Sequence, residues 1–295
     1  MTQPKQSTKV VRAGIESDTQ HNAVIPPIYL SSNFAFEDFG KPGKYDYTRS
    51  GNPTRDLLAE ALADLENGFG AVITATGMAA VTLVLQLCKP DELIFAPHDC
   101  YGGTYRLLNQ LKLREVVNAE FHNQLHDDFI EKIIDRKPKL VWIETPSNPL
   151  LRITDIVKIA DAAHQVGAVV VVDNTFLSPA LQQPLNLGAD IVIHSTTKYI
   201  NGHSDVVGGA VVTKSQEHYE YLKYWANCLG LTASPFDSYL TLRGLRTLKA
   251  RLAVHLANTK SIVSVLTQHQ AVQKTYYPGL KDHPGHAIAV TQQSD

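Results

Sequence analysis

The sequence predicts an α/β fold with a mostly parallel sheet flanked by helices. From about residue 54, helix-like amphipathic segments alternate with short apolar runs, a rhythm that is typical of βα units. Most of these runs are nearly continuous and rich in β-branched residues, as expected of strands covered on both faces. Polar residues cluster directly after the runs, where open α/β sheets bind their ligands.

The first helices are predicted from apolar residues that recur three and four positions apart. This spacing occurs at 54–67, 77–88 and 154–166. In the last segment Thr154 or Asp155 can cap the exposed amides, and Gly167 can end the helix.

The strands are predicted from short apolar runs that polar or turn-forming residues interrupt. Six such runs occur between these helices and after them. They span residues 71–76, 92–97, 139–144, 168–174, 190–195 and 206–213.

The two ends of the chain differ from its middle. Residues 1–53, rich in Pro, Tyr and Asn, show little periodicity and are expected to form an extended N-terminal arm. Residues 54–240 are expected to form a large α/β domain. Residues 241–295 contain a long helix-forming run and then a Pro/Gly loop, which predicts a connecting helix and the start of an incomplete C-terminal small domain.

Composition narrows the function classes. Apolar residues make up 44% of the chain and charged residues 19%, which is ordinary for a globular protein. The net charge of −2 and the lack of a Lys/Arg-rich tract argue against nucleic-acid binding. The three cysteines lack CxxC spacing, so we expect a reducing, cytoplasmic setting. No stretch reaches the roughly 18 apolar residues that a membrane span needs, so we expect no membrane residence.

Lys198 and Asp173 both follow apolar strand runs. An isolated lysine is usually a solvated surface residue, but Lys198 comes after a strand end and three hydroxyl residues. Hydroxyls can bind a phosphate, and a lysine in a dry pocket has the lowered pKa that a Schiff-base nucleophile needs. Asp173 follows four valines, and it is either a turn or cap aspartate or a carboxylate that holds a cofactor ring nitrogen protonated.

Two further turns could contact a flat, anionic ligand. At Gly77 and Met78 a strand gives way to a helix, an arrangement that presents backbone amides to an anion. Tyr101 precedes two glycines and could stack on a ring, although a half-buried loop tyrosine is the simpler interpretation. His283 and His286 have no evident third ligand, so we predict no metal site. The glycine motifs of dinucleotide and P-loop sites are absent, which disfavours nucleotide cofactors.

Taken together, six ordered motifs resemble the Cys/Met-metabolism enzymes that depend on pyridoxal phosphate (PLP). In these motifs the aspartate precedes the lysine by 25 residues. The resemblance runs essentially end to end and implies fold type I of the PLP-dependent transferases, with pyridoxal 5′-phosphate as cofactor. The motifs are YDYTRSGNPTR, TGMAA, HDCYGGTYR, ETPSNP, VVDNTFLSP and HSTTKYINGHSDVVGG.

The resemblance implies a role for each candidate residue. Lys198 would bind the cofactor as a Schiff base and carry protons, Asp173 would hold the ring nitrogen, and Tyr101 would stack on the ring. The phosphate would be bound by hydroxyls and amides of one subunit and by two residues of its neighbour, which implies a homodimer or homotetramer with shared active sites. The first group is Ser195, Thr197, Gly77 and Met78, and the second is Tyr47 and Arg49.

Within the family the chain is most similar to the cystathionine γ-synthase branch, which implies amino-acid substrates. The implied reaction replaces the γ-substituent of O-succinyl-L-homoserine with L-cysteine and gives L-cystathionine. Asp46, Arg106 and Asn148 are the implied substrate-side residues. A cystathionine γ-lyase or an enzyme that uses O-acetylhomoserine is the alternative.

The family also implies a substrate-carboxylate arginine in a C-terminal region, and this arginine has no counterpart here. Two hypotheses therefore stay open: a working transferase, and a truncated protein that binds PLP without productive turnover. A nucleotide-dependent α/β enzyme is a third, and the missing glycine motifs argue against it.

Overall fold

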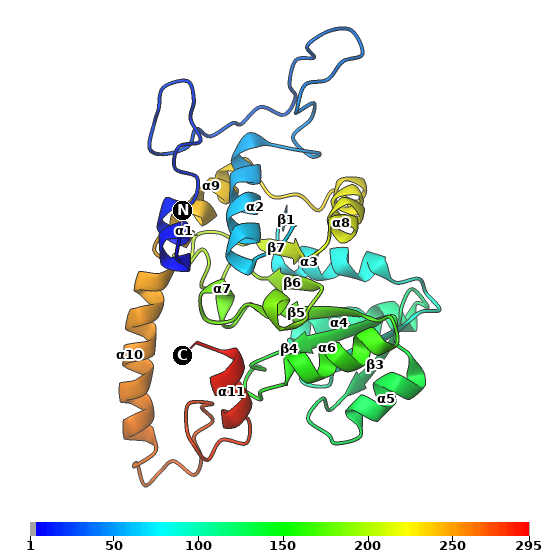
Figure 1. Ribbon diagram of the computed structural model, residues 1–295, viewed down its shortest axis with the longest axis vertical. Helices are drawn as coiled ribbons and strands as arrows, with labels where there is room; N and C mark the ends of the chain where they lie inside the picture. Colours follow the sequence, from blue (N-terminus) through cyan, green and yellow to red (C-terminus); the bar gives the residue numbers. More distant parts are fainter. Residues whose placement is uncertain (1–3, 295) are drawn as a thin grey trace. The chain divides into compact units, whose positions relative to one another are not determined.

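The computed structural model describes residues 4–294 (Figure 1). Contacts between its residues divide the chain into two compact units. The first unit comprises the chain up to Leu87 together with Ile193–Leu248. The second comprises Cys88–Val192 together with the residues from Lys249 onward. Strand β6, Ile191–His194, and helix α10, Leu248–Leu266, each begin in one unit and end in the other.

In the first unit, helices surround an antiparallel strand pair. Strands β1 and β7 pair with Val72 opposite Val211, and both are largely buried. Helices α2 and α8 contact β1, and α3 contacts β7. The elements are α1 (Gln6–Arg12), α2 (Pro53–Glu66), β1 (Gly70–Thr74), α3 (Gly77–Val84), η1 (Leu85–Leu87), β7 (Gly209–Thr213), α8 (Gln216–Leu229) and α9 (Pro235–Leu245).

Helix α2 shows how the sequence forms one of these elements. The side chain of Asn52 accepts hydrogen bonds from the amides of Thr54 and Arg55, and proline occupies the first helical position. At the other end Asn67 takes the left-handed conformation that stops the helix. Leu58 and Leu62 are fully buried, and the helix contacts α9 and β1.

In the second unit, four strands form a parallel sheet in the order β5-β4-β2-β3. Every residue of β4 is buried, as expected of a strand with both faces covered. The elements are β2 (Leu93–Pro97), α4 (Gly102–Leu113), β3 (Asn118–His122), α5 (Phe129–Arg136), β4 (Leu140–Glu144), α6 (Ile156–Gln165), β5 (Val169–Asp173), α7 (Ser178–Leu181), η2 (Pro184–Leu187) and α11 (His286–Gln292).

The predicted α/β class is confirmed, as are all six strands and the three early helices. Two boundaries were wrong: residues 75–76 and 206–208 lie outside β1 and β7. The arm also contains one short helix, α1, where the sequence suggested none. The division of the chain into three segments stays a prediction.

Among the described residues, no helix combines the length and the apolar character that spanning a membrane would require.

Candidate functional site

In the first unit, the start of α3 forms a cradle of backbone amides. The Thr76 hydroxyl caps this helix by accepting a hydrogen bond from the amide of Ala79 at 2.9 Å. A Cβ added to Gly77 would lie 2.8 Å from Cβ of Ser195 and 3.0 Å from its Oγ. Only glycine therefore allows Ser195 to pack this closely against the helix start, where the helix dipole favours an anion.

The segment after β6 folds into a tight turn that carries Lys198. The amide of Gly202 donates to the Lys198 carbonyl at 2.9 Å, and the amide of Lys198 donates to the Ser195 carbonyl at 3.3 Å. Thr197 Oγ1 accepts from the amide of Gly208 at 3.0 Å, which ties the two ends of the turn together. The side chain of Lys198 is exposed, so the described chain by itself does not provide the dry pocket that we expected around it.

A buried pair anchors the start of this turn. Glu66, the last residue of α2, and His194, the last residue of β6, are both fully buried. Their Oε1 and Nε2 atoms lie 2.7 Å apart. The residue directly before Ser195 is therefore held by a residue 128 positions earlier in the sequence.

The arm presents Tyr47 and Arg49 from a supported loop. The Arg49 guanidinium lies 5.2 Å from the centre of the Tyr47 ring, and its Nε donates to Asn227 Oδ1 at 2.8 Å. The buried Arg55 donates to the carbonyls of Thr48, at 2.6 Å, and Arg49, at 3.4 Å. Tyr47 itself is 47% exposed, so much of its ring is open to a partner.

In the second unit, two carboxyl groups lie at the same edge of the parallel sheet. Glu144 and Asp173 end β4 and β5 and are direct partners in the strand register. Glu144 is buried, and its Oε2 accepts from the amide of Tyr101 at 2.7 Å. Burial, and then the negative charge of Asp173, raise the pKa of Glu144 to about 8. Asp173 Oδ1 accepts from the amide of Thr175 at 3.0 Å, and the Tyr101 side chain is half exposed.

The residues implied for substrate binding are exposed. Arg106 lies on α4, one turn after Gly102, and Asn148 lies in the loop after β4. Asp46 belongs to the first unit, and hydrogen bonds from Ser50 and from the Tyr47 amide lower the pKa of its carboxyl.

The structure therefore groups the predicted residues by unit. The first unit contains Asp46, Tyr47, Arg49, Gly77, Met78, Ser195, Thr197 and Lys198, and the second contains Tyr101, Arg106, Asn148 and Asp173.

Sequence reasoning missed Glu144 and the burial of two cysteines, Cys88 and Cys100. Glu144 could have been found, because it ends an apolar run just as Asp173 does. Cys100 is buried beside Tyr101, and burial, followed by the charges of Glu144 and Asp99, raises the pKa of its thiol to about 12. Burial likewise raises the pKa of Cys88 to about 12.

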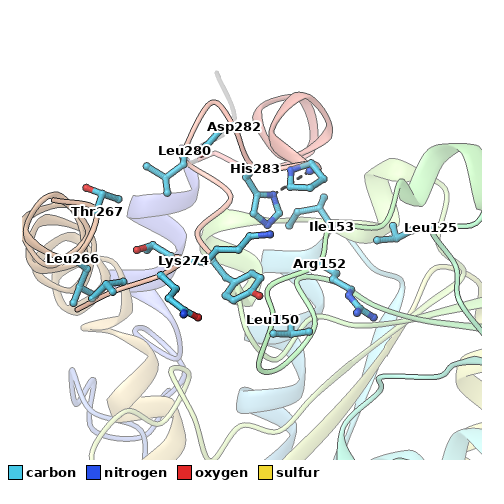
Figure 2. A pocket seen from close by; sticks show the side chains of 16 residues that line it. Leu125, Leu150, Arg152, Ile153, Leu266, Thr267, Lys274, Leu280, Asp282 and His283 are labelled. Atoms are coloured by element: carbon cyan, nitrogen blue, oxygen red, sulfur yellow. Dashed lines mark hydrogen bonds between the residues drawn. The ribbon is translucent and has the colours of Figure 1, made fainter. Parts of the chain in front are cut away.

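A separate cavity of about 520 Å³ lies within the second unit and contains none of the predicted site residues (Figure 2). Leu266 and Thr267, at the end of α10, lie across it from Arg152 and Ile153. Arg152 donates to His98 Nε2 at 2.8 Å and forms an ion pair with Asp99 at 3.2 Å. His283 also lines this cavity, and burial lowers the pKa of its imidazole.

Comparison with known proteins identifies relatives along almost the whole chain. A family model described as Cys/Met metabolism PLP-dependent enzyme matches residues 7–295. Cystathionine gamma-synthase of Escherichia coli (strain K12) is 52% identical over 290 residues, covering 98% of this chain and 75% of that protein. Cystathionine gamma-lyase of Bacillus subtilis (strain 168) is 43% identical over 288 residues, covering 98% of this chain and 76% of that protein. The structure of cystathionine gamma synthase from Xanthomonas oryzae pv. oryzae in complex with aminoacrylate and cysteine matches with a TM-score of 0.98 at 57% identity, over 99% of this chain and 76% of that one.

Proposed function

The chain belongs to the Cys/Met metabolism PLP-dependent enzyme family, and from this premise we propose that it catalyses a γ-replacement on an activated homoserine. In the proposed reaction the sulfur of L-cysteine bonds to Cγ of O-succinyl-L-homoserine, and the bond from Cγ to the ester oxygen breaks. Succinate leaves with the bonding electron pair, the thiol proton is released, and L-cystathionine is the product.

Sequence identity supports the choice of γ-replacement among the reactions of the family. The chain is 52% and 57% identical to two cystathionine γ-synthases and 43% identical to a cystathionine γ-lyase. The difference supports the synthase reaction over elimination. The 43% identity to the lyase keeps elimination as the second candidate reaction. The O-acetyl ester of homoserine is the alternative substrate.

The cofactor of the family is pyridoxal 5′-phosphate, and the residues present fit it. The glycine at the start of α3 leaves room beside Ser195 that a Cβ would fill, and the amides there suit a phosphate. The carboxyl pair at the ends of β4 and β5 suits a positively charged ring nitrogen. Bound PLP supplies an electron sink for carbanion chemistry.

We assign the roles of the chain's own residues as follows. Lys198 anchors the cofactor and carries protons to and from the substrate carbons, and Asp173 holds the positive ring nitrogen. Tyr101 covers the ring. Ser195, Thr197 and the amides of Gly77 and Met78 bind the phosphate, and the charged groups of the substrate are bound by Asp46, Arg106 and Asn148.

We also propose that the protein is a homodimer or homotetramer whose arm, residues 1–53, places Tyr47 and Arg49 in the neighbouring subunit's site. Exposed aromatic residues in the arm support this, since Phe36 is 53% and Phe39 fully exposed in the single chain. The described cysteines are free thiols, which supports a reducing cytoplasm.

The lysine assignment is tested with Lys198→Ala. Wild-type protein incubated with PLP and desalted should retain a visible absorption band, and the variant should lose it, because the covalent anchor is gone. Lys214→Ala is the matched control, a lysine outside the predicted motifs. A Lys198→Ala protein that keeps the band after desalting would refute the assignment.

The reaction is tested by following products from O-succinyl-L-homoserine with and without L-cysteine. Cystathionine and succinate in equal amounts are expected when cysteine is present. Formation of a 2-oxo acid at the same rate without cysteine would favour elimination. Retained PLP with no product from either substrate set would favour the binding-only alternative.

A further inference from the structure

Glu144 contacts or adjoins three of the residues assigned to the site, although no role has been assigned to it. Its carboxyl accepts a hydrogen bond from the backbone of Tyr101 at 2.7 Å. A backbone hydrogen bond also reaches it from Asn148, four residues along the chain. In the sheet it is the direct partner of Asp173.

A buried carboxyl group at the end of β4 requires an explanation, because burying a charge is costly unless a cation compensates it. Glu144 is 8% exposed and ends a strand that is otherwise wholly apolar. Among the described ion pairs none includes Glu144, and the nearby Asp99 already pairs with Arg152. The charged groups that act on Glu144 are the carboxylates of Asp173 and Asp99.

Glu144 and Asp173 lie on one rung of the sheet, and a buried carboxyl beside another carboxylate is most stable when it holds a proton. Burial and the charge of Asp173 place this proton on Glu144 near neutral pH, since they raise the pKa of Glu144 to about 8. A protonated carboxyl still has a carbonyl oxygen that can accept from the Tyr101 amide. The negative charge of the pair then belongs to Asp173.

We propose that Glu144 is a positioning residue of the cofactor site, which in its neutral form holds Tyr101 by the backbone amide and leaves the negative charge of the carboxyl pair on Asp173. The proposal rests on the proposed function, because it assigns Tyr101 to the cofactor ring and Asp173 to the ring nitrogen.

The test compares Glu144→Gln with Glu144→Ala in the holoenzyme near pH 7. Glutamine keeps a neutral acceptor for the Tyr101 amide, whereas alanine leaves that amide without its partner. We measure the Kd of PLP and the visible circular dichroism of bound PLP at saturation, which reports how the ring is held. Glu131→Gln, an exposed glutamate on α5, is the matched control.

Glu144→Gln should bind PLP within about twofold of wild type and keep the dichroic band. Glu144→Ala should bind PLP about tenfold more weakly and change that band even when saturated, as expected for an unpaired buried donor. If Glu144→Ala does not fold, Glu144→Asp replaces it, because the shorter side chain withdraws the acceptor.

Two results would overturn the proposal. One is wild-type affinity and dichroism in Glu144→Ala, or in Glu144→Asp where it stands in. The other is a Glu144→Gln protein as impaired as Glu144→Ala, which would show that a charge is needed in place of a neutral acceptor. A wild-type protein that retains no PLP would instead refute the proposed function, so the two failures are distinguishable.

Discussion

At position 77 the packing of the chain leaves room for glycine and for no larger residue. The backbone conformation of Gly77 is accessible to other residues, but Ser195 fills the space that a Cβ would need. The nearest atoms include the Ser195 Cα at 3.1 Å, so rotation of a flexible side chain cannot relieve the contact. The glycine is therefore required by the packing of the turn before Lys198 against the start of α3.

Gly77→Ala should weaken PLP binding by roughly tenfold to a hundredfold, because overpacking costs about 1–3 kcal/mol and moves the amides. Equilibrium dialysis against PLP measures this directly. Gly43→Ala is the control, since its Cβ would meet only the flexible side chain of Glu37, at 3.3 Å. An unchanged Kd in Gly77→Ala would show that the amides at this helix start do not bind the phosphate.

Glu144 should also make the stability of the apoprotein depend on pH. Its pKa is about 8 in the folded chain, against an unfolded value of 4.5. Between these values the folded state keeps a proton that the unfolded chain has lost, so the free energy of unfolding falls as pH rises toward 8. Glu144→Gln removes this contribution and should be more stable than wild type at pH 8 by on the order of 1–3 kcal/mol.

Urea unfolding at pH 5, 6.5 and 8 measures this difference between Glu144→Gln and wild type. The difference should shrink toward pH 5, because the unfolded wild-type chain begins to regain the proton as the pH approaches its pKa of 4.5. Glu131→Gln should show no such trend. A stability difference that is the same at all three pH values would contradict the raised pKa.

The buried pair of Glu66 and His194 matters at the scale of elements. It joins the end of α2 to the end of β6 across 128 residues of sequence. Each residue ends its element, so the pair fixes the point from which the turn carrying Lys198 departs.

His194→Ala should lower the free energy of unfolding by about 3–5 kcal/mol, because it removes the imidazole that lies 2.7 Å from a fully buried carboxyl. The control is His164→Ala, which breaks a partly exposed pair with Asp190 at a cost of at most about 1 kcal/mol. Chemical denaturation of both variants at one pH provides the comparison. Equal effects would mean that burial of the Glu66 pair adds nothing.

The elements that the sequence predicts best are those with the simplest patterns. Buried strands such as β4 and β5 were recognised because a strand that is covered on both faces has a nearly continuous run of apolar residues. Strand β3, with the sequence NAEFH, was missed because it pairs only with β2 and carries polar residues. Helix α1 was missed because its seven residues are too few for a periodic pattern.

The residues of the candidate site likewise differ in how well the sequence indicates them. Lys198 and Asp173 follow strand ends, so local sequence indicates them without a relative. Tyr47 and Arg49 depend on resemblance alone, because the arm shows little periodicity and no strand end that would mark them. The partnership of Glu144 with Asp173 depends on the strand register, which the sequence alone does not specify.

At the scale of the whole molecule, both compact units are discontinuous in sequence. Each is assembled from segments that lie more than 50 residues apart, so neither can finish folding from one continuous stretch of chain. The arm belongs to the first unit through the hydrogen bonds of Arg55 and Asn52, yet its exposed loop includes Tyr47 and Arg49.

The proposed sharing of active sites between subunits predicts complementation between two defective subunits. Lys198→Ala and Arg49→Ala homomers should each bind PLP poorly, for different reasons. After unfolding and refolding together, mixed dimers should contain one site with both residues intact and should recover tight binding in about a quarter of all sites, from random pairing of subunits. Absorbance of retained PLP measures the recovery. No recovery in verified mixed dimers would place Arg49 in its own subunit's site.

The raised pKa values of Cys88 and Cys100 affect which sulfur can react. Thiol–disulfide exchange and alkylation proceed through the thiolate, and at pH 7 a thiol with a pKa near 12 is ionised in roughly one molecule in 10⁵. Free cysteine, with a pKa near 8.5, is ionised at a few per cent. The burial of these two side chains thus keeps both sulfurs out of the competition for electrophiles and disulfides near neutral pH.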